Sequence, residues 1–249
     1  MSLDSISYQG TAAPNHSCVN ADGAPTSCAG CGIKRFAVCG ALGDNEIGDI
    51  ERIVHTIKLD PREPVFQEGD KAESIFTVTS GTIRLQRDLE DGRRQVIGFA
   101  VPGDFIGLAL EDHFSFSADA LTKASICSFD RNKFTDLVGR KPLLLRRLHD
   151  MASHELGIAQ EHMVVLGRRR AEERVAAFLL GWRNRVGRIQ GNSVTIPLPM
   201  GRQDIADYLG LTIETVSRIL ARWMRERIIL DVPNGVRVLD ADKLKAALR

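Results

Sequence analysis

Turn residues recur at nearly even intervals between Pro64 and Asp130, and this spacing constrains the fold more than any other feature of the sequence. Glycines stand at positions 69, 81, 92 and 103, which are twelve, eleven and eleven residues apart. Between them lie short runs rich in β-branched and aromatic residues, such as Ser74–Val78 and Gln95–Val101. Short strands at this spacing are typical of an antiparallel sandwich, barrel or jelly roll. We therefore predict an antiparallel β-roll over residues 46–138.

A helical pattern replaces the strand pattern after Pro142. Seven positions follow at alternating steps of four and three, which is the period of a seam between two helices, and six of them are apolar. The seam residues are Leu145, His149, Ala152, Leu156, Ala159, Met163 and Leu166. A second apolar face consists of Leu144, Leu148, Met151, Ile158 and Val165. A helix with two apolar faces packs against two surfaces, so we predict that residues 139–167 contact the roll and a second copy of the chain. Burial within a single chain is the alternative.

Residues 202–225 read as two helices joined by a tight turn. Gly210 stands where the turn favours a residue without a Cβ atom, and Thr212 is placed to cap the second helix. The core between the helices is expected to contain Ile205, Leu209, Val216, Ile219 and Leu220. Apolar segments on both sides of Pro233–Gly235 predict a hairpin after the second helix. Residues 168–249 are therefore predicted to form a winged helix-turn-helix domain in an α+β protein.

The charge of the chain divides at Gly167. Residues 168–249 contain 16 Lys and Arg against 9 Asp and Glu, whereas residues 1–167 contain 17 against 23. A basic unit on an acidic body is typical of polyanion binding, because Lys and Arg neutralise phosphates and release counterions. The net charge of +1 for the whole chain conceals this division.

The second predicted helix carries groups that can read DNA bases. Glu214, Ser217 and Arg218 share one face near its N-terminal end, which is the part of a recognition helix that reaches base edges. Arg218 can donate two hydrogen bonds to guanine, and Glu214 can accept one from cytosine. Thr212 and Arg222 flank this face and are expected to contact DNA as well, Arg222 through a phosphate. Double-stranded DNA is the predicted partner.

The chain has no apolar run near the roughly 18 residues that a membrane-spanning helix needs. Its N-terminus lacks the basic and apolar segments of a secretory signal. We therefore expect a cytoplasmic protein without a membrane partner. Because that compartment is reducing, the five cysteines are better candidates for metal ligation or redox sensing than for disulfides.

Four cysteines are candidate ligands of one cofactor. Residues 1–45 are predicted to form an N-terminal arm followed by a glycine-rich loop that contains Cys28, Cys31 and Cys39, and Cys127 lies in a predicted strand. Thiolates select soft sites. Zinc sites usually contain two C-x2-C pairs or matching histidines, whereas glycine amides near the ligands suit the inorganic sulfur of a cluster. The pattern favours an iron–sulfur cluster, with zinc and unliganded thiols as alternatives. Cys18 is expected not to be a ligand.

From about Cys28 to its C-terminus, the chain resembles the CRP/FNR family of transcription regulators, and most closely the oxygen-sensing FNR branch. The resemblance rests on the cysteine triplet, Cys127, the segment Ala171–Phe178 and the pattern Glu214-x2-Ser217-Arg218. It implies a 4Fe-4S cluster on the four cysteines, which oxygen degrades and which favours a DNA-binding homodimer. It further implies that Glu214, Ser217 and Arg218 read an inverted repeat with a TTGAT-like half-site, and that activation involves RNA polymerase.

Three features differ from family patterns. Seven residues precede the third cysteine instead of the five in the founding FNR pattern. Ala159 stands at the seam position that can carry an Asp, so any repulsion between cluster-free subunits depends on other groups, such as Glu155. The cyclic-nucleotide branch places an Arg-Ser pair at the phosphate, whereas this chain has Phe116-Ser117 there, beside the mostly apolar segment Phe105–Asp112. An apolar ring does not neutralise a phosphate, so no cyclic nucleotide is expected.

Other functions remain as alternatives. An iron–sulfur electron carrier or redox enzyme would use the same cysteines, and a family regulator could sense another ligand. Haem would need a ligand among the scattered histidines 113, 149 and 162. No arrangement of serine, histidine and carboxylate residues indicates catalysis, so we do not expect an enzyme.

Overall fold

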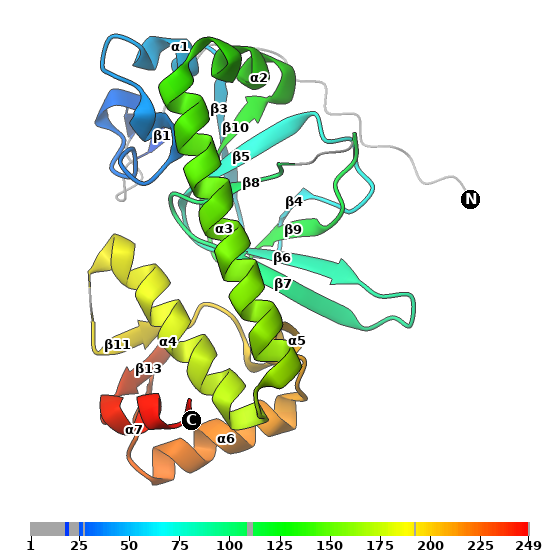
Figure 1. The fold of residues 1–249 in the computed structure, drawn as a ribbon, viewed down its shortest axis with the longest axis vertical. Coiled ribbons are helices and arrows are strands. Elements are labelled where there is room, and N and C mark those ends of the chain that lie inside the picture. Colours follow the sequence, from blue (N-terminus) through cyan, green and yellow to red (C-terminus); the bar gives the residue numbers. More distant parts are fainter. Residues whose placement is uncertain (1–17, 20–24, 27, 109–111, 192, 249) are drawn as a thin grey trace.

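The computed structural model of the chain describes residues 18–19, 25–26, 28–108, 112–191 and 193–248. A β-roll occupies one end of the molecule, a long helix runs along it, and a mostly helical domain occupies the other end (Figure 1). The expected arm before Cys18 lies outside the described residues, as do residues 109–111 of the segment that was compared with the cyclic-nucleotide branch.

The predicted roll is confirmed as two antiparallel four-stranded sheets. One sheet has the strand order β3-β10-β5-β8 and the other has the order β4-β9-β6-β7. The strands are β3 (Val54–Leu59), β4 (Pro64–Phe66), β5 (Ser74–Ser80), β6 (Ile83–Asp88), β7 (Arg94–Ala100), β8 (Phe105–Ile106), β9 (Ser117–Ala120) and β10 (Ala124–Asp130). Between the sheets lies an apolar core that includes Val78, Ile83 and Ile126.

Glycine sets the turns of the roll. The four evenly spaced glycines all have positive φ, between 79° and 98°. At Gly81 a Cβ atom would also meet the backbone of Lys123 and Ala124, so this turn has no room for a side chain. The turn positions that were predicted from sequence therefore separate the strands as expected.

A short N-terminal region covers one end of the roll. Its elements are β1 (Cys18–Val19), β2 (Pro25–Thr26), the 3₁₀-helices η1 (Cys28–Gly30) and η2 (Val38–Ala41), and α1 (Ile47–Glu51). Residues 28–41, which we name the cysteine loop, pack against the roll, α2 (Arg131–Arg140) and α3 (Pro142–Arg168). Asp130 caps α2 by accepting a hydrogen bond from the Lys133 amide.

The long helix α3 has one buried and one exposed apolar face. Leu144 and Val165 are buried, and Leu148, Met151 and Ile158 are half-buried. These five residues form the face that was predicted to contact the body of the protein. α3 begins at Pro142, three residues after the predicted start, because proline is favoured in the first turn of a helix.

The C-terminal domain is a winged helix-turn-helix, as predicted. It contains α4 (Ala171–Gln190), β11 (Thr195–Pro197), α5 (Arg202–Leu209), α6 (Ile213–Arg225), β12 (Ile229–Val232), β13 (Gly235–Val238) and α7 (Ala241–Ala246). The three strands form a sheet in the order β11-β13-β12. Gly210 ends α5 in the left-handed conformation, and all five predicted core residues are buried.

The apolar core of the C-terminal domain extends into the roll. Phe99 of β7 packs edge-on against Phe178 and Trp182 of α4, and it also contacts Tyr208 of α5. The two domains therefore share one continuous core. Among the described residues, no helix is both long enough and apolar enough to cross a membrane.

Candidate functional site

The structure brings the four predicted cysteine ligands together. Cys28, Cys31 and Cys39 of the cysteine loop and Cys127 of β10 all line one small cavity of about 20 Å³. Cys28 and Cys127 are buried, and the other two are half-buried. Cys18 lies in β1, where it pairs with Thr26 of β2.

The cavity between the cysteines is small and is bounded by a buried hydroxyl group and a tightly closed loop. The Thr77 hydroxyl lines the cavity and is buried without a hydrogen-bond partner among the described residues. Such a donor can serve a ligand sulfur. A Cβ atom at Gly40 would run into the Lys34 carbonyl, so the loop can close around the cavity only with glycine there. A cavity this small holds about one water, so the loop must move outward to admit a cluster.

Thiolates are ligands both of zinc and of iron–sulfur clusters. Among the described residues, no three His, Cys, Asp or Glu side chains are arranged to hold one metal ion. A zinc ion draws its ligands to about 2.3 Å from one centre. In a 4Fe-4S cluster each thiolate binds a different iron, so the four sulfurs can stand farther apart.

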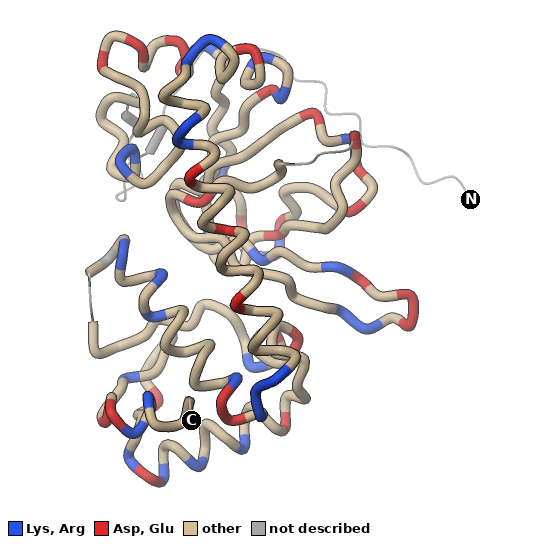
Figure 2. The backbone as a smooth tube through the Cα atoms, viewed as in Figure 1, with Lys and Arg blue, Asp and Glu red and all other residues tan. Residues whose placement is uncertain are grey.

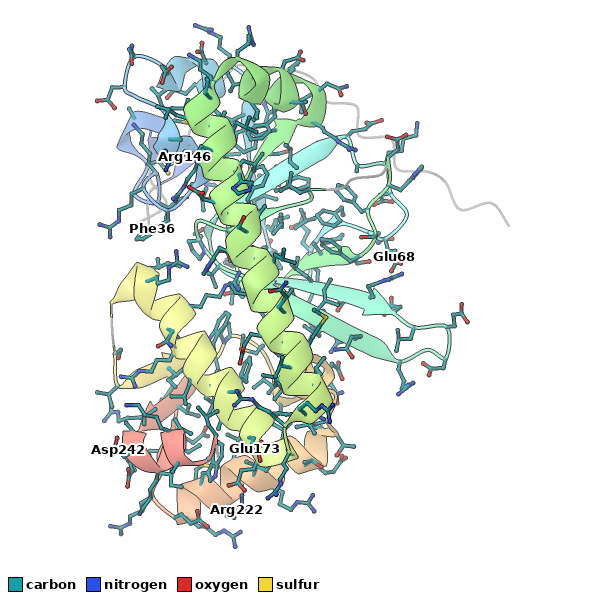
Figure 3. The ribbon with its side chains drawn as sticks, viewed as in Figure 1. Phe36, Glu68, Arg146, Glu173, Arg222 and Asp242 are labelled. Carbon is teal, nitrogen blue, oxygen red and sulfur yellow. The ribbon has the colours of Figure 1, made fainter. Side chains whose placement is uncertain are left out.

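Hydrogen bonds connect the cysteine loop to α3. Arg147 of α3 donates to the carbonyl oxygens of Arg35 and Phe36, at 3.1 and 2.9 Å. Phe36, labelled in Figure 3, lies between Cys31 and Cys39. At the start of the helix, the ammonium of Lys141 pairs with Glu46 and Asp49 and holds the pKa of both carboxyl groups below the usual range. A movement of the cysteine loop therefore acts directly on α3.

The predicted seam lies on the exposed face of α3. Six of its seven residues are exposed in the single chain, and Leu166 is half-buried. Leu145, Leu156 and Met163 are 52%, 58% and 62% exposed. Rows of large exposed apolar side chains are unusual on a monomer and mark contact surfaces. Glu155 lies beside the seam and pairs with Arg185 of α4, which it shares with Asp104 of the roll.

The predicted base-reading residues project from α6. Glu214, Ser217 and Arg218 are all exposed, while Val216, Ile219 and Leu220 on the opposite face are buried. Thr212 caps α6 by accepting a hydrogen bond from the Thr215 amide, which fixes where the helix begins. Arginines recur along α6, and Arg168–Arg170 lie just before α4, whose first turn also carries Glu172 and Glu173 (Figure 2). The surface is suited to a polyanion.

Arg222 has a partner that the sequence pattern did not reveal. Its guanidinium is half-exposed and pairs with Glu172 in the first turn of α4, and Glu172 also accepts a hydrogen bond from Trp223. Figure 3 labels Arg222 on α6, below α4. Arg222 therefore connects the recognition helix to α4, and its predicted phosphate contact remains a prediction. Arg225, farther along α6, is exposed.

His162 makes the stability of the fold depend on pH. Its ring stacks on Tyr208 of α5, and burial holds the pKa of His162 below the ordinary value of 6.5. Below pH 6.5 the unfolded chain therefore binds more protons at His162 than the folded protein does. Because of this difference, the free energy of unfolding has its full value above pH 6.5 and decreases as the pH falls. We expect His162→Phe to reduce the loss of unfolding free energy between pH 7.5 and 5, measured by urea denaturation. The same change at the exposed His113 serves as the control, and an equal loss in His162→Phe and wild type would contradict the assignment.

Comparisons with known proteins agree with this architecture. Residues 56–141 match the cyclic nucleotide-binding domain family, and residues 173–247 match the Crp-like helix-turn-helix domain family. The chain is 48% identical to the transcriptional activatory protein AadR of Rhodopseudomonas palustris, over 87% of this chain and 90% of that protein. It is 46% identical to the nitrogen fixation regulation protein FixK of Bradyrhizobium diazoefficiens, over 88% and 92%.

A solved structure is similar across both domains. The structure of FixK2 from Bradyrhizobium japonicum aligns with a TM-score of 0.72 and 33% identity, covering 78% of this chain and 97% of that one. The two family matches cover the roll and the helix-turn-helix domain, in this order along the chain. With this identity and coverage, the chain belongs to the CRP/FNR family of transcription regulators.

Proposed function

We propose that this chain is an oxygen-responsive transcription activator that binds an inverted repeat of DNA as a homodimer. The observation that carries the oxygen response is the convergence of Cys28, Cys31, Cys39 and Cys127 on one cavity beside α3. The names of these relatives support gene activation and do not mention a cofactor. The proposal of a cluster therefore depends on the four cysteines alone. RNA polymerase is the expected partner in activation.

The cysteines would hold a 4Fe-4S cluster. When bound, such a cluster supplies a crosslink between four thiolates that oxygen destroys. With the four thiolates fixed, the cysteine loop is ordered, and Arg147 and Lys141 keep α3 in place for pairing with a second copy. Without that constraint the loop relaxes and the dimer population falls.

A homodimer explains why the proposed DNA site is an inverted repeat. Two copies of α6 must stand about one turn of DNA apart, roughly 34 Å, to reach successive major grooves. Binding through both half-sites is much tighter than binding through one, because the second contact is intramolecular. The cysteine loop and α6 lie at opposite ends of the molecule (Figure 1), so α3 has to connect them.

The exposed face of α6 that carries Glu214, Ser217 and Arg218, which we name the reading face, gives a prediction about sequence specificity. We expect Arg218→Ala to weaken binding to a TTGAT-like palindrome by about 1–3 kcal/mol and to relax the preference for guanine. Arg225→Ala, which removes an exposed guanidinium outside the reading face, is the matched control. Fluorescence anisotropy with single-base variants of the half-site measures both effects. An equal loss on every DNA sequence would instead make Arg218 a phosphate contact.

The effector is expected not to be a cyclic nucleotide. Phe116 is half-buried and lines a cavity of about 400 Å³ between the roll and α3, together with Phe105 and Leu108. The cavity is also lined by Arg147, Arg185 and Arg188, and each of them already contacts a group of the protein. Isothermal titration with cAMP should therefore show no binding.

Anaerobic gel shifts test the proposed function as a whole. Protein prepared without oxygen should bind the palindrome tightly and with a steep salt dependence, and it should lose this binding in air. Absence of binding at any salt concentration would favour an electron carrier. Air-stable binding would leave a DNA-binding regulator without oxygen sensing.

A further inference from the structure

A network of five charged side chains joins the roll to the helix-turn-helix. Arg84 of β6 pairs with Asp119 of β9 at 2.8 Å and also with Asp204 of α5. Arg94 of β7 pairs with Asp204 at 2.8 Å and donates from Nε to Asp207 of α5 at 2.9 Å. We name these five residues the docking network. It connects two strands of the β6–β7 hairpin with the first helix of the DNA-binding motif.

The docking network is largely shielded from water. The side chains of Arg84, Asp119, Asp204 and Asp207 are only 12–14% exposed, and that of Arg94 is 26% exposed. Charges at this depth are stable only when they are paired, so separating the hairpin from α5 would leave uncompensated charge. Each guanidinium also bonds two carboxylates, so the directions of these hydrogen bonds restrict how α5 can be oriented on the hairpin.

A second ionic contact fixes the same domain at another point. Arg185 of α4 pairs with Asp104 of the roll at 2.8 Å and with Glu155 of α3 at 3.0 Å. Between the two contacts, Phe99 packs into the core of the C-terminal domain. One contact would permit rotation about itself, whereas two ionic contacts with an apolar core between them define a single orientation. Relative domain motion is otherwise the usual expectation.

We infer that Arg84 and Arg94 are positioning residues that set which half-site spacing the dimer accepts. The inference rests on the proposed binding of a palindrome. α6 follows α5 after a short turn, so the orientation of α5 on the roll determines where α6 is presented relative to the seam of α3. A rigid presentation restricts the dimer to one spacing and lowers the entropy cost of reaching both half-sites.

Binding to palindromes of different spacing tests this inference. The double variant Arg84→Gln/Arg94→Gln alters only the roll side of the network, so Asp204 keeps its capping contact with the Gly201 amide. Arg87→Gln is the matched control, because Arg87 lies on the same hairpin but pairs with Glu68. Anaerobic full-length proteins are compared by fluorescence anisotropy on three kinds of DNA. These are a single half-site, the TTGAT-like palindrome, and palindromes whose spacing is lengthened or shortened by one base pair.

We expect the double variant to bind the TTGAT-like palindrome about tenfold more weakly than wild type does. It should also lose much of the wild-type discrimination between half-site spacings. Affinity for the single half-site should not change, which also shows that the C-terminal domain is folded. The charge exchange Arg94→Asp/Asp207→Arg should discriminate between spacings better than the double variant does, although less well than wild type. Arg87→Gln should behave as wild type.

Two results would overturn the inference alone while wild type still binds the palindrome. One is an unchanged spacing profile in the double variant. The other is tighter binding by that variant, which would mean that the network holds α6 away from DNA. If wild-type protein fails to bind any palindrome, the proposed function falls, and this inference falls with it.

Discussion

Replacing Cys39 by serine should reduce anaerobic affinity for the palindrome about 100-fold, near the upper end of typical allosteric coupling. A serine hydroxyl is a hard, weakly acidic ligand that does not replace a thiolate at a soft iron site. The cysteine loop would then have no crosslink to Cys127, and α3 would lose the constraint that favours pairing. Anisotropy titration in an anaerobic chamber, with and without air exposure, measures the change.

Cys18 provides the matched control for this prediction. It is the one cysteine that the sequence pattern does not predict as a ligand, so Cys18→Ser should keep the affinity of wild type and its sensitivity to air. Serine at Cys28, Cys31 or Cys127 should act like serine at Cys39. If Cys18→Ser were as damaging as Cys39→Ser, the assignment of ligands would be wrong.

The second large effect is expected from Leu156→Glu in the seam. Leu156 is 58% exposed in the single chain and lies near the middle of the seven seam residues. In a paired seam the two glutamates would lie close together in an apolar contact without a cation. Burying an unpaired charge costs several kcal/mol, so the dimer should weaken by a factor of about 100 or more.

Sedimentation equilibrium under anaerobic conditions measures this dimer constant directly. Leu143→Glu is the control, because Leu143 is 64% exposed on α3 but lies outside the seam. It introduces the same charge and should leave the dimer intact. Equal dissociation in both variants, or in neither, would contradict the assignment of the seam.

Local patterns predicted much of this fold. The turn glycines placed the strands, since positive φ at each of them follows from the local chain. The winged helix-turn-helix was predictable because Gly210, Thr212 and the core residues of α5 and α6 lie within a short segment. The four cysteines were singled out by residue type, and the structure adds that a distant strand places Cys127 beside the other three.

Contacts between distant segments were not predictable in this way. Arg84 and Asp204 are 120 residues apart, and no local pattern identifies them as partners. Arg222 looked like an ordinary exposed arginine of a recognition helix, although Glu172 pairs with it from α4. In both cases the partner is selected by how the domains pack, and that packing depends on the shared core around Phe99.

The central claim is that four cysteines hold an iron–sulfur cluster that makes DNA binding sensitive to oxygen. Iron and acid-labile sulfide content, determined on protein kept strictly anaerobic, is its most direct test. The account predicts about four iron and four sulfide per chain, both lost after exposure to air. Protein that contains neither, yet binds the palindrome as tightly as before, would contradict it.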